Sequence, residues 1–312
     1  MEPDRRRELA QLISQIDRLS PADPLPLPGD SHPLGSAYRI GITGPVGAGK
    51  SSLINQVTRA YRQRSLTVGI IAVDPTSPFT GGALLGDRVR MADTALDEGV
   101  FVRSLATRGA SGGLATATVD AADLLDAFGF DRIILETVGV GQSEVAIADA
   151  CDITCVVLEP GAGDSIQALK AGLMEIADLF VVNKKDMRGA DRFILDLATI
   201  LEMKPDATRP EILATSANRG EGVPELVDWL ERYYQQIREN GKISVHRIGQ
   251  RAERVRRLAN EYVTREFWER LPDDAIAQAI ADDAPVRDAA RKLVAKLFAA
   301  APMTPRRGHK PQ

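Results

Sequence analysis

A phosphate-binding loop is the strongest chemical signal in the sequence. The run GPVGAGKS, Gly44 to Ser51, fits the pattern Gly-x-x-x-x-Gly-Lys-[Ser/Thr]. Glycines in such a loop let backbone N–H groups curl around phosphate oxygens, and the N-terminus of the following helix adds partial positive charge. We expect Lys50 to contact the β- and γ-phosphates and the Ser51 hydroxyl to ligate Mg²⁺. The other residues expected to contact the nucleotide here are Gly44, Gly47, Ala48, Gly49 and Ser52.

A second loop, far along the chain, could select the base. Asn183-Lys184-Lys185-Asp186 follows the apolar run LFVV and matches the pattern Asn-Lys-x-Asp. The Asp186 carboxylate can accept hydrogen bonds from guanine N1–H and the 2-amino group, whereas adenine offers an acceptor and no amine there. The stem of Lys184 can cover the base or brace the phosphate loop. Downstream, Ser216 and Ala217 resemble a turn whose backbone N–H meets guanine O6.

Acidic residues end two apolar runs where a magnesium ion would be held. Glu136 closes RIILE and is followed three residues later by Gly139, which predicts an Asp-x-x-Gly type switch with Glu in place of Asp. Asp74 closes TVGIIAVD. Because ligands of open α/β sheets gather at the carboxyl ends of strands, both acids are candidates for Mg²⁺ or its waters. Asp87 is a further candidate, and it fits a helix N-terminus equally well.

These residues require a parallel sheet that brings them to one edge. Residues 38 to 218 alternate short apolar runs with longer helical patterns, which is typical of βα units. The expected strands are YRIGIT, TVGIIAVD, GVFVRSL, RIILETV, ITCVVLE, LFVVNK and EILATS. We therefore predict an α/β fold with a mostly parallel β-sheet P-loop NTPase core, an N-terminal helix and a C-terminal helical extension.

The predicted domains follow from where this alternation begins and ends. Residues 1–37 hold an amphipathic helix over 2–19 and a proline-rich linker, and residues 38–240 form the P-loop domain. We expect residues 241–302 to form a helical arm and residues 303–312 to form a disordered tail. Within the arm, a helix over 252–271 could make a dimer contact or pack on the sheet.

Composition narrows the range of partners and compartments. The formal net charge of −4 at pH 7 argues against binding nucleic acid or an anionic membrane through bulk charge. No run approaches the roughly 20 apolar residues that a membrane span requires, and without an apolar N-terminal segment we expect a cytoplasmic protein. Cys151 and Cys155 lie in a strand-like run, so we expect buried small apolar side chains there and not a metal site.

Three longer runs together resemble one family of GTPases. They are AVDPTSPFTGGALLGDRVRM, ETVGVGQSE and EPGAGDSIQALKAGLMEIADLFVVNKKD. They resemble the MeaB/ArgK family, whose members accompany adenosylcobalamin-dependent methylmalonyl-CoA mutase and related acyl-CoA mutases and belong to the SIMIBI class of P-loop NTPases. The resemblance is close over about residues 38 to 220 and looser over the C-terminal helices.

The resemblance implies a role for each acidic candidate. Glu136 and Gly139 match the family's second switch, in which Glu replaces the usual Asp. Asp74 and Asp87 fall on the first switch and its magnesium shell. The metal ligands that we expect are therefore Ser51, Asp74, Asp87 and Glu136.

A third switch is implied for residues 161–170. The resemblance places Asp164, Gln167 and Lys170 where nucleotide state would be coupled to the mutase. From the residues alone, GAGDSIQALK is a Gly-x-Gly loop capped by Asp164 and followed by a helix. Lys170 is also compatible with an ordinary solvated helix lysine. The candidate catalytic residues are Lys50, Asp74, Glu136 and Lys170.

The group that orients the attacking water is not evident. Ras-type enzymes place a glutamine directly after the switch glycine, whereas this chain has Val140 there and its first glutamine at Gln142. We therefore predict slow intrinsic hydrolysis that a partner accelerates by ordering the switches.

The resulting hypothesis is a homodimeric, Mg²⁺-dependent GTPase that converts GTP to GDP and phosphate. It would act as a chaperone that gates adenosylcobalamin loading and protection of an acyl-CoA mutase, with methylmalonyl-CoA mutase as the first candidate. One alternative is a P-loop kinase or transport-associated ATPase. Another is a nickel-insertion GTPase, against which the sparse histidines and cysteines argue. A scaffold that binds GTP without turnover is a third alternative.

Overall fold

The chain divides into two units. The computed structural model describes residues 1–16, 19–74, 94, 96–106, 113–137, 147–161, 172–202, 204–205, 209–272, 274–280 and 285–299. Unit 1 comprises residues 1–19 and 23–254, and unit 2 comprises residues 20–22 and 255–312. The domain boundaries expected from the sequence, including the tail over 303–312, stay predictions, and that tail lies outside the described residues.

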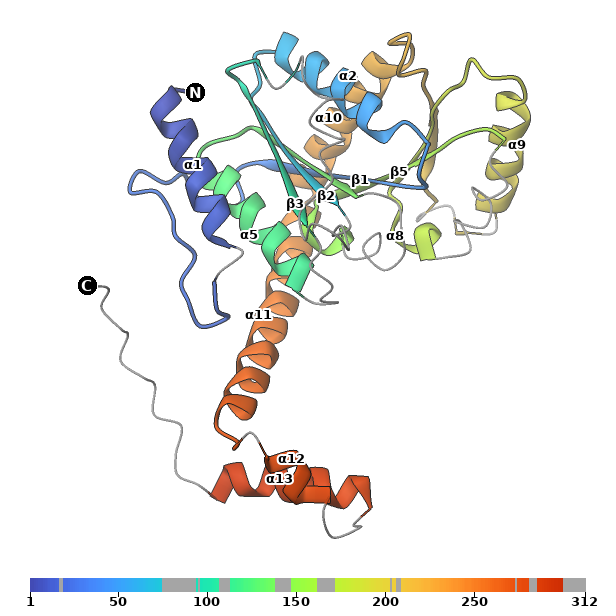
Figure 1. Ribbon diagram of the computed structural model, residues 1–312. Helices are drawn as coiled ribbons and strands as arrows, with labels where there is room; N and C mark the ends of the chain where they lie inside the picture. The colour runs from blue at the N-terminus through green and yellow to red at the C-terminus, as the bar shows by residue number, and fades with distance from the viewer. Residues whose placement is uncertain are drawn as a thin grey trace. The chain divides into compact units, whose positions relative to one another are not determined.

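A seven-stranded sheet forms the centre of unit 1 (Figure 1). Its strands lie in the order β3-β2-β4-β1-β5-β6-β7, and their pairings are parallel. The strands are β1 (Tyr38–Thr43), β2 (Val68–Asp74), β3 (Val100–Ala106), β4 (Arg132–Thr137), β5 (Ile153–Leu158), β6 (Leu179–Val182) and β7 (Glu211–Ala214). The predicted parallel sheet and its seven strands are confirmed. All strands end at one edge, the carboxyl edge, and begin at the other, the amino edge.

Helices cover both faces of the sheet, which explains why the strands are almost continuously apolar. In β4, Ile134 faces the core formed with α2 (Lys50–Gln63) and α10 (Val223–Glu239). Its neighbour Ile133 faces the opposite core, which α1 and α5 cover. The described residues of unit 1 also include the helical elements α1 (Pro3–Ile16), α5 (Gly113–Ala127), η1 (Ala148–Ala150), α8 (Met174–Ile176) and α9 (Ala190–Leu201), and the first part of α11 (Lys242–Glu269).

Helix α11 (Lys242–Glu269) begins ten residues before the helix expected over 252–271. Gly249 lies within it, and a glycine in a helix interior costs about 1 kcal/mol relative to alanine. Tertiary contacts offset this cost. Arg247 pairs with Asp152 through two bonds of 2.6 Å, and Gln250 donates to the Cys151 carbonyl at 2.7 Å.

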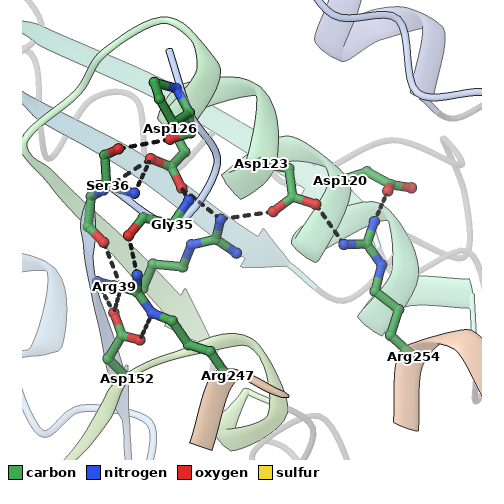
Figure 2. Close-up of polar contacts among 11 residues, drawn as sticks. Gly35, Ser36, Arg39, Asp120, Asp123, Asp126, Asp152, Arg247 and Arg254 are labelled. Carbon is green, nitrogen blue, oxygen red and sulfur yellow. Dashed lines mark hydrogen bonds and ion pairs between the residues drawn. The ribbon is translucent and has the colours of Figure 1, made fainter. Parts of the chain in front are cut away.

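Ion pairs close the amino edge of unit 1 (Figure 2). Asp126 of α5 is fully buried and accepts a hydrogen bond of 3.0 Å from the Arg39 guanidinium. It also accepts backbone N–H bonds from the segment 35–37. Asp123, one helical turn earlier, accepts hydrogen bonds from the guanidinium groups of Arg39 at 2.7 Å and Arg254 at 2.5 Å. These contacts join the start of β1, α5 and the first part of α11.

Unit 2 contains the end of α11, α12 (Ala275–Ile280) and α13 (Val286–Ala299). Its buried apolar cluster is small and consists of Ala275, Ala279, Ala289 and Leu293, with Phe267 and Leu271 packed against it.

Two further expectations concern buried and membrane segments. Cys151 and Cys155 are free, buried thiols, and burial raises the pKa of each well above its usual value, as expected for small core side chains. Within the described ranges, no helix combines the length and the apolar character needed to cross a membrane.

Candidate nucleotide-binding site

The phosphate loop lies between β1 and α2 at the carboxyl edge. Gly44 has φ of 135°, and a Cβ there would lie 2.1 Å from the Val157 carbonyl oxygen of β5, so only glycine fits. Gly47 and Gly49 also have positive φ, at 90° and 83°. A backbone with left-handed residues at such positions can point successive N–H groups toward an anion, as in anion-binding loops. Ser52 is exposed in the first turn of α2.

Lys50 and Ser51 are the first two residues of α2. Their side chains make contacts that they could share with a phosphate and a cation. Lys50 is 7% exposed and donates to the carbonyl oxygens of Gly44 at 2.8 Å and Pro45 at 3.0 Å. The Ser51 hydroxyl donates to Glu136 Oε1 at 2.7 Å. Glu136 is 2% exposed at the end of β4. A hydroxyl and a carboxylate oxygen side by side fit Mg²⁺, which prefers oxygen ligands and uses few from the protein.

Asp74 ends β2 at the same edge. The strand register pairs Ala72 with Glu136, so the Asp74 backbone lies two residues further along. The Asp74 side chain lies outside what the structure describes. The predicted residues Asp87, Gly139, Asp164, Gln167 and Lys170 also lie outside the described residues.

Asn183 joins three segments of the site. Its Nδ2 donates to the Ala48 carbonyl of the phosphate loop at 2.9 Å. Its Oδ1 accepts from the Ala217 N–H at 3.0 Å and from the Thr215 hydroxyl at 3.2 Å. Asn183 is only 2% exposed. This side chain therefore holds the phosphate loop and the Ser216-Ala217 turn together, a positioning contribution that the sequence motif did not reveal.

Asp186 is an exposed residue of the expected base pocket, and Ser216 beside it is buried. The Ser216 hydroxyl donates to Asp186 Oδ1 at 2.6 Å, and Arg219 lies 3.5 Å from Oδ2. The Ser216 hydrogen bond, the Asp186 backbone N–H and Arg219 lower the pKa of the Asp186 carboxyl. A carboxylate that stays ionised at neutral pH suits the guanine contacts predicted for it. The Ala217 N–H, by contrast, already donates to Asn183.

Lys184 pairs with Glu159, an acidic residue that sequence reasoning missed. Glu159 directly follows β5, and its Oε2 accepts the Lys184 ammonium. The signal that could have found it is the one used for Asp74 and Glu136, because Glu159 also closes a buried strand at the carboxyl edge.

Comparisons with known proteins identify a family of GTPases. The family model described as methylmalonyl-CoA mutase-associated GTPase MeaB matches residues 30–271. A Pyrococcus horikoshii protein, provisionally named a GTPase, is 42% identical over 300 residues, covering 94% of this chain and 94% of the relative. The GTPase ArgK of Escherichia coli is 36% identical over 240 residues, covering 75% of this chain and 72% of the relative.

A solved structure supports the fold. The crystal structure of an LAO/AO transport system kinase has a TM-score of 0.68 to this chain at 24% sequence identity. The match covers 94% of this chain and 93% of that one. At this identity the likeness shows the fold alone.

Proposed function

Because this chain belongs to the MeaB family of methylmalonyl-CoA mutase-associated GTPases, we propose that its GTP hydrolysis gates adenosylcobalamin loading and protection of an acyl-CoA mutase. The resemblance inferred from three sequence runs is thus confirmed, and the chain is a GTP hydrolase. The association stated in the family's description makes methylmalonyl-CoA mutase the first candidate partner.

The observation that carries the nucleotide assignment is the set of Asn183 contacts. One buried side chain bonds to Ala48 of the phosphate loop and to Ala217 of the Ser-Ala turn. Asn183 and Ala48 are 135 residues apart in the sequence. A glycine-rich turn that matched the pattern by chance would have no reason to share a buried amide with an Asn-Lys-x-Asp loop so far along the chain. The two halves of a guanine nucleotide, phosphate and base, would contact these two linked loops.

Hydrolysis would proceed by attack of water on the γ-phosphate. A new bond forms between the water oxygen and phosphorus, the bond to the β–γ bridging oxygen breaks, and its electron pair stays on GDP. The protons of the water leave with the released inorganic phosphate. Lys50 would stabilise the growing negative charge together with backbone N–H groups of the loop. Ser51, Glu136 and Asp74 would hold Mg²⁺ or its waters, and the ion would supply positive charge to the phosphates when bound.

Slow intrinsic turnover is part of the proposal. Val140 stands where a water-orienting glutamine would be expected, so the isolated protein would lack a well-placed group for the water. Turnover by the purified protein alone on the order of tens per second would contradict this.

We propose that unit 2 forms a homodimer contact. Its buried cluster is small, whereas Trp268 is 49% and Val286 79% exposed, and large exposed apolar surfaces mark interaction sites. Light scattering during gel filtration should give twice the monomer mass for the wild type and the monomer mass for Ile280→Glu. A monomeric wild type would reject this contact.

The test of the chaperone proposal uses purified methylmalonyl-CoA mutase. We expect a complex on gel filtration whose amount differs between GDP and a non-hydrolysable GTP analogue, and faster GTP turnover when mutase is present. Adenosylcobalamin transfer, followed by its absorbance, should require a hydrolysable nucleotide. An active GTPase that forms no complex with the mutase in either nucleotide state would sink the proposal.

Nucleotide competition separates the GTPase from the ATPase and kinase alternatives. Tight GDP binding that excess ADP does not displace supports a guanine site. Displacement by ADP would favour the adenine-using alternatives.

A further inference from the structure

Glu159 lies against the phosphate loop although it belongs to neither sequence motif. It follows β5, and its side chain is 15% exposed. A Cβ placed on Gly47 would lie only 3.2 Å from Glu159 Oε1, while Oε2 accepts the Lys184 ammonium. The carboxylate therefore spans from the middle of the phosphate loop to the guanine motif.

Lys184 approaches the other half of the loop, beside the Asn183 amide, which lies closer to Gly49. The Lys184 Cε lies 4.0 Å from the position of a Cβ on Gly49. Its φ is 58°, a left-handed conformation that is uncommon outside glycine, so the surrounding structure must hold it. The Lys184 stem and the Glu159 carboxylate together occupy the space beside Gly47 and Gly49, the two glycines whose positive φ shapes the anion-binding concavity.

The charge on Glu159 is unexpected at this place. An acid beside an anion-binding loop opposes the approach of a polyphosphate unless a neighbouring cation neutralises it. Lys184 provides that cation through a partly buried ion pair. The carboxylate and the ammonium of this pair therefore offset each other's charge beside the phosphate loop.

We propose that Glu159 is a positioning residue for the nucleotide. It holds Lys184 across the outer side of the phosphate loop and so keeps the loop in its binding shape before the phosphates arrive. This inference rests on the proposed function, since it assumes that the loop binds GTP and GDP. A preformed loop lowers the ordering cost of binding, so the effect appears in nucleotide affinity and not in the chemical step.

The neighbouring lysine offers a matched control. Lys185 pairs with Glu221 at 3.4 Å, a longer contact whose side chains are 33% and 49% exposed. The two pairs share the same chemistry and adjacent lysines of one tetrapeptide. Glu221→Ala should therefore leave GDP release and GTP turnover unchanged, because exposed ion pairs contribute little.

The test measures release of a fluorescent GDP analogue from the full-length protein with Mg²⁺ present. We expect Glu159→Ala to release it roughly tenfold faster, as fits loss of one hydrogen bond to a charged group. The KM for GTP should rise by a similar factor, while kcat stays within about twofold because the contact is made equally before and during reaction. Glu159→Gln should restore most of the affinity, since its amide oxygen can still accept from Lys184.

The effect of Glu159→Gln on binding of the GDP analogue should change sign when Lys184 is also replaced. This change of sign distinguishes a positioning role of Glu159 from a merely structural one. Lys184→Met keeps the stem but removes the positive charge, so the Glu159 carboxylate should then repel the phosphates. In that background, Glu159→Gln should bind the GDP analogue more tightly than Lys184→Met alone, although in the wild-type background the same change weakens binding slightly.

Three results would overturn the proposal. They are a Glu159→Ala release rate equal to wild type, a kcat that falls with unchanged KM, and a Lys184→Met, Glu159→Gln protein that binds no better than Lys184→Met. The last comparison uses two folded variants and holds even if Glu159→Ala proves unstable. Wild-type protein that fails to bind GDP would instead refute the proposed function, so the two failures are distinguishable.

Discussion

The two edges of the parallel sheet both contain charged side chains with little exposure, but they use them differently. At the amino edge, Asp126 is fully buried and Asp152 nearly so, and each meets an arginine and backbone N–H groups of the same chain (Figure 2). At the carboxyl edge, Lys50 donates to carbonyls of its own loop, and the Ser51 hydroxyl donates to Glu136. The first arrangement is complete within the protein, whereas the second presents groups that a phosphate and a cation can take over.

This difference teaches how one fold divides its polar groups between stability and function. Helix α5 contributes Asp120, Asp123 and Asp126 to the amino edge, where they pair with Arg39 and Arg254, and Asp152 pairs with Arg247. Removing a partner there leaves an uncompensated buried charge and costs stability. Changes at the carboxyl edge should instead alter ligand binding while leaving the fold in place.

The largest effect is expected from Asp126→Ala. This change leaves three backbone N–H groups and part of Arg39 without their acceptor in a fully buried place. The free energy of unfolding, measured by urea denaturation, should fall by about 3–5 kcal/mol. Turnover per folded molecule should stay within about twofold, because the site lies at the opposite edge.

Asp228→Ala is the control for that prediction. Asp228 pairs with Arg64 at 2.5 Å, but its side chain is 54% exposed. The cost of removing it should be about 0–1 kcal/mol, as for other exposed pairs. Equal costs for Asp126→Ala and Asp228→Ala would show that the amino-edge network is not the stabilising feature described above.

Lys50→Ala should produce the next largest effect, and on the other edge. Removing one positioned cation from a phosphoryl-transfer site should lower kcat/KM for GTP by roughly 100- to 1000-fold. The melting temperature without nucleotide should change little, because Lys50 pairs with carbonyls of its own loop that water can reach once the side chain is gone. A loss below about tenfold would mean that Lys50 does not face the phosphates.

Asp186→Asn should change which base is preferred. Loss of a charged acceptor should weaken GDP binding by roughly ten- to a hundredfold. Xanthosine diphosphate, which has a carbonyl in place of the 2-amino group, should bind the variant better than the wild type, because the Asn amide donates. Calorimetric titration of both nucleotides into both proteins measures this, and unchanged preference would place the base elsewhere.

The smallest expected effect is a pH dependence of folding stability. It involves two aspartates, one before β6 and one after it. Burial raises the pKa of Asp178, before the strand, while Ser216 lowers that of Asp186, after it. The folded state therefore holds the Asp178 proton more tightly than the unfolded state, and this contribution to stability is lost as pH rises above about 4 through the raised pKa.

Urea unfolding of wild type and Asp178→Asn across this range tests the sign. The wild type should lose stability relative to the variant as pH rises above about 4. GDP affinity should show no fall caused by Asp186 over the same range, since the lowered pKa keeps that carboxylate ionised. If the wild type instead becomes more stable relative to Asp178→Asn as pH rises, the hydrogen bonds that Thr154 and Tyr233 donate to the Asp178 carboxylate outweigh the effect of its burial.

The sequence predicts the carboxyl edge better than the amino edge, and the reason is physical. Phosphate and guanine recognition depend on local runs, such as Gly44 to Ser51, whose spacing is fixed by the ligand. The seven strands follow from continuous apolar runs that helices must cover. These features are local in sequence and therefore visible in it.

The features that sequence reasoning missed join distant residues. Asp120 and Arg254 pair across 134 positions, and nothing local distinguishes them from solvated helix charges. Glu159 and Asn183 likewise acquire their contacts only when the strands lie side by side. The start of α11 was misplaced for the same reason, because Arg247 and Gln250 stabilise the turn around Gly249 through distant partners.

The most direct test of the division between the two edges is a thermal melt with and without nucleotide. GDP with Mg²⁺ should raise the melting temperature of both the wild type and Asp126→Ala, whereas ADP should raise neither. Lys50→Ala should melt near the wild-type temperature and show a much smaller shift with GDP. Equal shifts from ADP and GDP, or a full GDP shift in Lys50→Ala, would contradict the account.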